Sequence, residues 1–319
     1  MSGAGEIASD DGSGASRRES TDTVAGRLVV VTGAGNGIGA ALAAESARRG
    51  ASTVVVADID NDAAEQVASH INSGGGKAVG VRCDVTDADA LDGLAGELCA
   101  RHGTPGLVCA NAGVAASGGP LLDGEPRDAR WVLEVNFFGV LATLRSFGRA
   151  MAAAQEPGWL LATGSEHSLG LPHAGAGAYT ASKHAVLGLC EVMRAELPAH
   201  VGISVLCPGL TSSRLWASGA HRPGEFGGPT EPQPISQAII ERGMPAEVVA
   251  QRALEGVAAG HFVIATHYNA RAYADARAAE VAAAFDRLAA HDTSSWDVGE
   301  VAATVLGELA VSNEDSGGG

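Results

Sequence analysis

The sequence predicts an α/β protein with a parallel sheet of seven strands that helices cover on both faces. Three observations lead to this prediction. Seven short apolar runs follow one another along the chain, roughly 15–25 residues of helical pattern separate most of them, and the runs are apolar almost throughout. Such strands are typical of a parallel sheet buried on both faces, and the alternation of strand and helix is typical of right-handed βαβ units.

The predicted strands are rich in Val, Leu, Ile and Ala. They lie at residues 27–31, 53–57, 78–82, 106–109, 159–162, 203–206 and 261–264. The chain has 319 residues, of which 46% are hydrophobic and only 4% are aromatic. A chain of this length can bury one large core, and here that core must consist mainly of aliphatic side chains.

The composition divides the chain into four parts. Residues 24–268 contain all the predicted strands and are expected to form a single main domain, the catalytic one if the chain is an enzyme. Residues 1–23 and 312–319 are rich in Gly, Ser and acidic residues and are predicted to be disordered tails. Residues 269–311 are predicted to form a helical extension. The long Gly- and Pro-rich segment 211–245 is expected to be a functional lid or substrate loop.

The charge and the cysteines exclude several classes of protein. A net charge of -16 argues against nucleic-acid and anionic-membrane partners, because both need a basic surface. The five cysteines are odd in number and scattered without a C-x-x-C pair, which favours free thiols over disulfides or a metal site. No apolar run approaches the ~18 residues that a membrane-spanning helix needs. We therefore expect a cytoplasmic protein without a metal.

A glycine-rich turn follows the first predicted strand and opens a helical pattern. It reads Thr32-Gly33-Ala34-Gly35-Asn36-Gly37-Ile38-Gly39. Glycines at such a turn let backbone N–H groups approach a pyrophosphate, and the helix N-terminus favours the negative charge. A tight turn of small residues without a ligand is the alternative.

Asp58 strengthens the case for a dinucleotide. It ends the second predicted strand, 19 residues after Gly39, near the offset of about 20 at which an acidic side chain accepts hydrogen bonds from an adenosine ribose. A solvent-facing aspartate at a strand end is the alternative. Neither Asn36 nor Ile59 supplies a positive charge for a 2′-phosphate, so NAD is favoured over NADP.

Further motifs occur in a fixed order between residues 24 and 265. They are Cys83-Asp84-Val85-Thr86, Asn111-Ala112-Gly113, Asn136, Tyr179-x-x-x-Lys183 and Pro208-Gly209. With the glycine turn, they resemble the short-chain dehydrogenase/reductase family in its compact branch. The turn reads T-G-x-x-x-G-x-G and does not match the G-x-x-G-x-x-G of the extended branch. The resemblance implies a Rossmann-like, doubly wound sheet and NAD(P)-linked alcohol or carbonyl chemistry.

The resemblance also assigns cofactor-binding positions. It places the cofactor backbone at Gly33, Gly37 and Gly39, with Asn36 and Ile38 in the same turn, the adenine at Asp84 and Val85, and support for the cofactor at Asn111 and Gly113. Pro208 and Gly209 would lie beside the nicotinamide. Ser213 stands where the family often has a threonine that bonds the carboxamide, and it retains the hydroxyl.

Tyr179 and Lys183 are the candidates for proton transfer. They are four residues apart in a helical pattern and therefore share one helix face. A free tyrosine, with a pKa of about 10, is a weak base at neutral pH. A nearby ammonium and the positive nicotinamide of an oxidised cofactor would lower that pKa, and Lys183 would also hold the nicotinamide ribose. A half-buried core tyrosine beside a solvated lysine is the alternative.

The serine of the set is less clear from spacing. In the family it usually precedes the tyrosine by thirteen residues, which here is Glu166, and a carboxylate cannot donate a hydrogen bond unless it is protonated. Ser165 directly follows a predicted strand, as the family's serine does, so we favour Ser165 for orienting and polarising the reacting oxygen. Ser168, eleven residues before Tyr179, is the competitor.

Asn136 and four other residues complete the predicted site. Asn136 lies in a helical run, and by resemblance it anchors a proton-relay water linked to Lys183; a satisfied core amide is the alternative. Glu166, His167, Ser168 and Trp216 are predicted to lie beside the substrate, where His167 would contact it or assist proton release. Polar loop groups that face solvent are the alternative for Glu166 and His167.

Together these residues predict an NAD-dependent oxidoreductase that interconverts a secondary alcohol and a ketone, with Tyr179 as general acid/base. An NADP-dependent carbonyl reductase is an alternative, and it requires Asp58 to turn away from the ribose. A non-catalytic dinucleotide-binding protein is a weaker alternative, because such proteins typically lack the tyrosine or the lysine. By resemblance, a homodimer or homotetramer paired through the helices around Asn136 and Tyr179 is expected.

Overall fold

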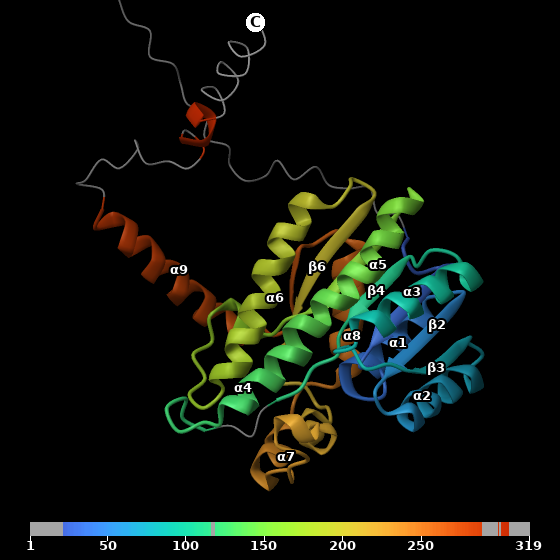
Figure 1. Ribbon diagram of the computed structural model, residues 1–319, viewed down its shortest axis with the longest axis horizontal. Coiled ribbons are helices and arrows are strands. Elements are labelled where there is room, and N and C mark those ends of the chain that lie inside the picture. The colour runs from blue at the N-terminus through green and yellow to red at the C-terminus, as the bar shows by residue number, and fades with distance from the viewer. Residues whose placement is uncertain (1–21, 116–118, 289–298, 300, 306–319) are drawn as a thin grey trace, which may run out of the picture. The chain divides into compact units, whose positions relative to one another are not determined.

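Seven parallel strands form the sheet of the main unit, in the order β3-β2-β1-β4-β5-β6-β7 (Figure 1). The computed structural model describes residues 22–115, 119–288, 299 and 301–305. The chain divides into a unit that ends at Arg271 and a second unit, Ala272–Gly319. The strand order and the helices on both faces of the sheet confirm the predicted Rossmann-like fold.

Each predicted apolar run overlaps a strand. The strands are β1 (Leu28–Thr32), β2 (Thr53–Asp58), β3 (Ala78–Arg82), β4 (Leu107–Ala110), β5 (Gly158–Thr163), β6 (Val201–Cys207) and β7 (Val263–Ala265). The helices of this unit are α1 (Gly37–Arg48), α2 (Asn61–Ser73), α3 (Ala88–His102), α4 (Pro126–Leu133), α5 (Val140–Ala154), α6 (Gly177–Glu196), α7 (Pro234–Ile240) and α8 (Ala246–Ala258). A π-helical turn, Glu134–Gly139, joins α4 to α5.

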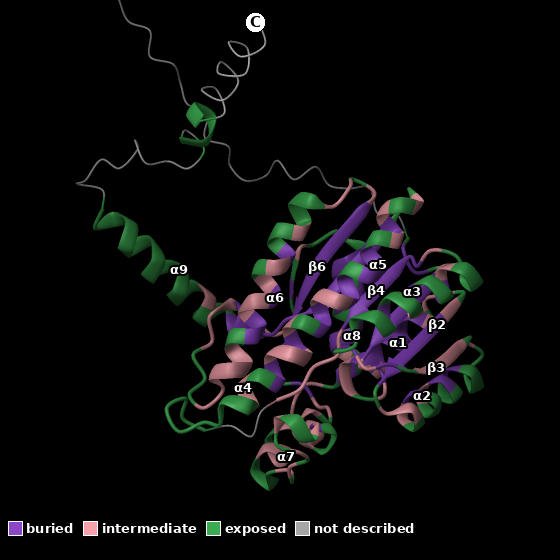
Figure 2. Cartoon of the chain, in the orientation of Figure 1, coloured by how far each residue is buried: buried purple, intermediate pink, exposed green. Residues whose placement is uncertain are grey.

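The core consists of two layers, one on each face of the sheet, and Figure 2 shows strands β2, β4 and β6 as buried. Helices α1, α2 and α8 cover one face, and α3, α5 and α6 cover the other. Successive side chains of a strand point to opposite faces. Val29 and Val31 therefore belong to the first layer and Leu28 and Val30 to the second, which explains why β1 is apolar throughout.

Segment 211–245 is folded rather than extended. It contains the short 3-10 helices Leu215–His221 and Gly224–Phe226, followed by α7. Its two ends are held together, because Ser212 N–H donates to Met244 O at 2.9 Å and Met244 N–H donates to Leu210 O at 2.9 Å. Arg222 of this segment is buried and forms an ion pair with Asp128 of α4. The segment is therefore tied both to its own base and to α4.

The second unit contains most of one long helix, α9 (Arg271–Asp286), which lies within the run predicted to be helical. Of the two predicted tails, only residues 22 and 23 fall within the described residues. All five cysteines are described and have free thiols. Among the described helices, none combines the length and the apolar character needed to cross a membrane.

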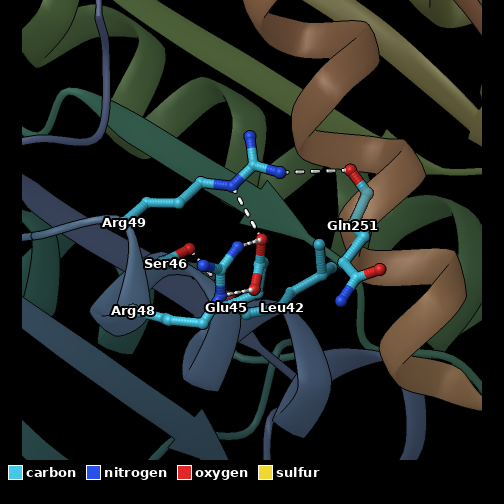
Figure 3. A network of polar contacts seen from close by, with 6 residues as sticks. All are labelled: Leu42, Glu45, Ser46, Arg48, Arg49 and Gln251. Carbon is cyan, nitrogen blue, oxygen red and sulfur yellow. Dashed lines mark hydrogen bonds and ion pairs between the residues drawn. The ribbon is translucent and has the colours of Figure 1, made fainter.

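A buried carboxylate links α1 to α8 through a polar network (Figure 3). Glu45 accepts hydrogen bonds from Arg48 Nε at 2.6 Å and from Arg49 Nε at 2.8 Å, and Arg49 Nη2 donates to Gln251 O of α8 at 3.3 Å. The hydrogen bond with Arg48 is the largest influence on the Glu45 carboxyl, and its pKa lies below the ordinary value although burial opposes the shift. The ionised form of Glu45 therefore stabilises the fold.

We expect Glu45→Gln to lower the free energy of unfolding by about 1–3 kcal/mol at neutral pH, because the buried hydrogen bonds to two guanidinium groups weaken. The folded pKa of Glu45 is depressed, so its contribution is complete above the ordinary carboxyl pKa of about 4.3 and is lost as the pH falls through the lower folded value. Urea unfolding of both proteins between neutral and acidic pH measures the difference, which should shrink with acidification.

The matched control for this prediction is Glu97→Gln. Glu97 pairs with Arg101 at 2.8 Å on α3, but the two side chains are 59% and 67% exposed, so we expect a loss of less than about 0.5 kcal/mol. Equal losses in the two variants would show that burial of Glu45 does not strengthen its network.

Candidate active site

A cleft of about 1630 Å³ opens at the carboxyl edge of the sheet, where ligands bind in doubly wound α/β proteins. Residues from the ends of β1, β2, β4, β5 and β6 line it, together with parts of α4, α6 and segment 211–245. Eighteen of the predicted site residues line this cleft: Gly33, Asn36, Gly37, Ile38, Asp58, Ile59, Asp84, Val85, Asn111, Gly113, Ser165, Glu166, His167, Tyr179, Lys183, Pro208, Gly209 and Ser213.

Four predicted residues do not line the cleft. Gly39 lies inside α1 and packs against Gly33, and Asn136 is fully buried in the π-helical turn. Ser168 is buried, with its hydroxyl occupied by backbone groups, and Trp216 of segment 211–245 lies outside the lining. Ser168 and Trp216 are therefore not among the residues that line the cleft, and their contact with a substrate stays a prediction.

The glycine turn requires glycine for steric reasons. Gly33 has a φ of +62°, and a Cβ on it would lie 2.6 Å from Ala112 Cα. A Cβ on Gly37, which has a φ of +53°, would lie 2.7 Å from Ser213 Cβ, and one on Gly39 would lie 2.1 Å from Gly33 O. The Asn36 side chain makes no capping hydrogen bond at the start of α1. The first turn of α1 thus presents backbone N–H groups to the cleft in a cradle that fits a pyrophosphate.

Asp58 is held against this turn by the backbone. Its Oδ2 accepts a hydrogen bond from Gly35 N–H at 2.8 Å, and its Oδ1 accepts one from Asp60 N–H at 3.0 Å. Asp58 is buried yet lines the cleft, so its free lone pairs face a ligand there. Its chain neighbours, Ala57 and Ile59, are apolar. An acceptor fixed in this way suits a ribose diol and repels a phosphate.

Asn111 connects the ends of three strands. Its Nδ2 donates to Thr32 O at 3.2 Å and to Gly33 O at 3.1 Å, and its Oδ1 accepts a hydrogen bond from Thr163 Oγ1 at 3.1 Å. These bonds tie the end of β4 to the glycine turn after β1 and to the end of β5. Asn111 therefore fixes the floor of the cleft from within the protein.

Tyr179 and Lys183 lie on one face of α6 at the cleft, as their spacing predicts. Lys183 Nζ lies 5.6 Å from the centre of the Tyr179 ring and donates to Thr163 O at 2.8 Å. Burial lowers the pKa of Lys183 to about 8. Burial is also the largest influence on Tyr179 and raises its pKa; the hydrogen bond with the Ser165 side chain lowers it, and the Glu166 charge raises it.

The raised pKa of Tyr179 differs from the expectation that the Lys183 ammonium would lower it. The reason is that the phenol loses its hydration at the base of the cleft, and the lysine itself is desolvated there. In the chain alone, the ionised form of Tyr179 is therefore disfavoured.

The π-helical turn presents Asn136 to the backbone of residue 114. Asn136 Oδ1 accepts from Val114 N–H at 2.7 Å, and its Nδ2 donates to Val114 O at 3.0 Å and to Ser182 Oγ at 3.1 Å. A Cβ on Gly113 would lie 3.3 Å from Asn136 Oδ1 and 3.5 Å from Lys183 Nζ, so these two residues meet at Gly113. The Asn136 side chain thus holds the loop beside Lys183, a role that spacing alone does not reveal.

The two candidate serines have different surroundings. Ser168 Oγ donates to Lys183 O at 2.6 Å and accepts from Ser165 N–H at 3.2 Å, so it links the 3-10 turn Glu166–Leu169 to α6. Ser165 Oγ accepts from His167 N–H at 3.2 Å, and its side chain lowers the pKa of Tyr179 against the larger effect of burial. Of the two, Ser165 is the serine that lines the cleft.

His167 is buried beside the tyrosine, edge-on to its ring with 5.2 Å between ring centres. Its Nδ1 lies 2.8 Å from Thr180 Oγ1. Burial, reinforced by the charge of His173, lowers the pKa of His167 to about 4. The low pKa makes the imidazole a weak base, and a role of His167 in assisting proton release stays a prediction.

Several contributors to the site had no distinct sequence signal. Thr163 ends an apolar run, Ser182 is one of several polar residues between Tyr179 and His184, and the π-helical turn reads as ordinary helix. His267, whose Nδ1 accepts from Gly209 N–H at 3.0 Å, comes from the far end of the unit. Only the polar Asn136 in an apolar run pointed to a special position. Within the described residues, no group of three or more His, Cys, Asp or Glu side chains is arranged to hold a metal ion.

Known proteins are similar to this chain in both sequence and fold. The family model for short chain dehydrogenases matches residues 27–223. The chain is 37% identical to the 1-deoxy-11-beta-hydroxypentalenate dehydrogenase of Streptomyces exfoliatus over 206 residues, which are 64% of this chain and 74% of that protein. It is 27% identical over 258 residues to a CLA biosynthesis dehydrogenase/reductase of Lactiplantibacillus plantarum, covering 76% of this chain and 89% of that one.

A solved structure is similar over most of its length. The short chain dehydrogenase/reductase from Burkholderia phymatum, crystallised in complex with NAD, has a TM-score of 0.77 and 30% identity, covering 82% of this chain and 96% of its own. The family match, the strand order and the tyrosine–lysine pair at the carboxyl edge of the sheet lead to one conclusion. This chain belongs to the short-chain dehydrogenase/reductase family of oxidoreductases.

Proposed function

We propose that the chain is an NAD-dependent oxidoreductase that interconverts a secondary alcohol and a ketone, with Tyr179 as general acid/base. The observation that carries this proposal is the convergence of Tyr179, Ser165 and Lys183 at the cleft that also contains the glycine turn. Bound NAD supplies the hydride acceptor for oxidation, and its reduced form supplies the donor for reduction. The chain must therefore hold the substrate oxygen and move its proton.

Tyr179 moves that proton between its phenol oxygen and the substrate oxygen. In ketone reduction the phenol donates the proton to the oxygen as the carbonyl becomes an alcohol. In alcohol oxidation the ionised phenol takes the hydroxyl proton. Burial favours the neutral phenol, so the chain holds Tyr179 ready as a donor.

Ser165 orients and polarises the reacting oxygen. It lines the cleft together with Tyr179, so the two hydroxyl groups together can contact one substrate oxygen. Ser168 instead holds the backbone of Lys183 and Ser165, so it supports the turn that carries Ser165. The assignment of Ser165 rests on this difference in partners.

Lys183 and Asn136 complete the proton path. Lys183 Nζ bonds to Thr163 O at the end of β5 and has two further protons to donate, which suits the ribose of a nucleotide and a relay water. Asn136 fixes the loop at Gly113, directly beside that ammonium. Asp58, with Oδ2 fixed to Gly35 of the glycine turn and Oδ1 to the backbone of Asp60, supports NAD as the cofactor over NADP.

Segment 211–245 acts in this proposal as the lid of the substrate site. It contributes many of the residues that line the cleft, among them Leu215, Phe226 and Ile239. Its ion pair between Arg222 and Asp128 ties it to α4 across the opening. Apolar side chains from the segment suit a partly apolar substrate.

Replacing Tyr179 with Phe should lower kcat by about 10²–10⁴-fold, because the proton donor and acceptor is lost, while the affinity for NADH changes by less than about twofold. A panel of secondary alcohols and ketones with each cofactor, followed at the nicotinamide absorbance, identifies the turnover, and fluorescence titration measures the binding of NADH. Undiminished turnover in the variant would show that another group transfers the proton.

Alanine should mainly reduce catalysis at Ser165 and mainly reduce stability at Ser168. Ser165→Ala should lower kcat/KM by about tenfold or more through loss of a hydrogen bond to the reacting oxygen, with a stability loss of about 1 kcal/mol from the lost cap. Ser168→Ala should lower the free energy of unfolding by about 2–3 kcal/mol, because two buried backbone groups lose their partner. Kinetics and urea unfolding on both variants compare them; a larger kinetic loss in Ser168→Ala at equal folded fraction would reverse the assignment.

Asp58→Ala should weaken NAD binding by about tenfold and NADP binding much less, because the ribose diol loses its acceptor while a 2′-phosphate loses a repelling charge. Titration with each cofactor measures the ratio of the two dissociation constants. Asp62→Ala on the exposed start of α2 is the matched control for the change in net charge and should leave both constants unchanged. An unaltered NAD/NADP ratio in Asp58→Ala would refute the role of this carboxylate.

A further inference from the structure

Glu166 is a carboxylate in the cleft that the chemistry proposed above does not use. It directly follows Ser165, lines the cleft, and is half-buried. Its backbone N–H donates to Pro208 O at 2.8 Å, which fixes the residue between β5 and the end of β6. Its Oε2 is one of two buried side-chain polar atoms without a hydrogen-bond partner among the described residues.

The protein atoms around this oxygen do not supply a donor. A Cβ on Gly209 would lie 2.8 Å from Glu166 Oε2 and 2.7 Å from His267 Cγ, so the carboxylate packs against both residues. His267 Nδ1 accepts from Gly209 N–H at 3.0 Å, so the ring proton is on Nε2, which lies 3.0 Å from Leu210 O. Both ring nitrogens of His267 are therefore hydrogen-bonded to backbone groups, and the imidazole cannot donate to Glu166.

A buried carboxylate oxygen without a donor is costly, and a ligand that brings a donor offsets this cost. Burial is the largest influence on the Glu166 carboxyl and raises its pKa, so its charged form is disfavoured. A cationic ligand gains less from such a carboxyl group. A neutral hydroxyl needs only the hydrogen bond and is the better match.

The position of this hydroxyl follows from the neighbours of Glu166. Ser165 precedes it in the chain, and Ser165, Glu166 and Tyr179 all line the same cleft. Burial is the largest influence that raises the pKa of Tyr179, and the charge of Glu166 adds to it. A carboxylate so close to the group that holds the reacting oxygen can reach a substituent on the adjacent carbon. More distant parts of a substrate would instead contact segment 211–245, which lines the rest of the cleft.

We propose that Glu166 accepts a hydrogen bond from a substrate hydroxyl on the carbon next to the reacting one, so that the preferred substrates are vicinal diols and the corresponding α-hydroxy ketones. This inference rests on the proposed function, in which Ser165 and Tyr179 bind the reacting oxygen. Glu166 then determines specificity and neither donates nor accepts the transferred proton.

The kinetic test compares cis-cyclohexane-1,2-diol with cyclohexanol, which differ by one hydroxyl. The wild-type protein should oxidise the diol with the higher kcat/KM, and Glu166→Ala should lower kcat/KM for the diol by about 10- to 100-fold, with less than about threefold change for cyclohexanol. Glu166→Gln retains an acceptor oxygen and should keep part of the preference. Glu196→Ala, which removes an exposed carboxylate at the end of α6, should leave the preference unchanged.

A binding test separates this inference from the proposed function. The diol and NADH are both in the reduced state and cannot react, so calorimetry of the diol and of cyclohexanol against the protein saturated with NADH needs no turnover. Tighter binding of the diol to the wild type, lost in Glu166→Ala, supports the inference even if neither alcohol is oxidised, in which case the proposed function fails alone. Equal binding of the two alcohols, or an effect of Glu166→Ala on NADH affinity with the diol preference intact, overturns it.

Discussion

The position of the site depends on the parallel pairing of β1 with β2 on one side and with β4 on the other. Thr32 is in register with Ala57, and Val31 with Cys109, so the glycine turn, Asp58 and Asn111 emerge at one edge of the sheet. The connection after β1 leads to β2 on one side of β1, whereas the connection after β4 leads to β5 on the other side. The two connections therefore separate at this edge of the sheet, which leaves room for a ligand. A shift of one residue in β1 would move its side chains to the opposite core layers and disperse these groups.

Hydrogen bonds to the backbone, rather than ion pairs, stabilise the polar groups that this edge buries. Lys183 bonds to Thr163 O, Ser168 bonds to Lys183 O, and Asn136 bonds to both backbone groups of Val114. The sheet and α6 fix these backbone acceptors, so the hydrogen bonds hold the side chains in place against rigid elements. This arrangement explains how Lys183 can be buried although no carboxylate of the described residues pairs with it.

The sequence predicted the fold and most of the lining of the site because both follow local rules. Apolar runs identify buried strands, glycines at a turn identify close backbone contacts, and a spacing of four places Tyr179 and Lys183 on one helix face. Tertiary contacts determine what the sequence does not reveal: Ser168 bonds to the backbone of Lys183, and Trp216 is not among the residues that line the cleft. The raised pKa of Tyr179 likewise follows from burial, which no spacing between residues reveals.

The electrostatics of the cleft connect substrate recognition to proton transfer. Burial and the charge of Glu166 both raise the pKa of Tyr179, while the hydrogen bond with Ser165 lowers it. A substrate hydroxyl that donates to Glu166 would draw the carboxylate charge toward itself and weaken its repulsion of an ionised phenol. A hydroxyl recognised in this way would make Tyr179 a stronger acceptor for the proton of the neighbouring alcohol. A monoalcohol would leave the full charge of Glu166 acting on the phenol, so the same contact would favour the diol in binding and in the chemical step.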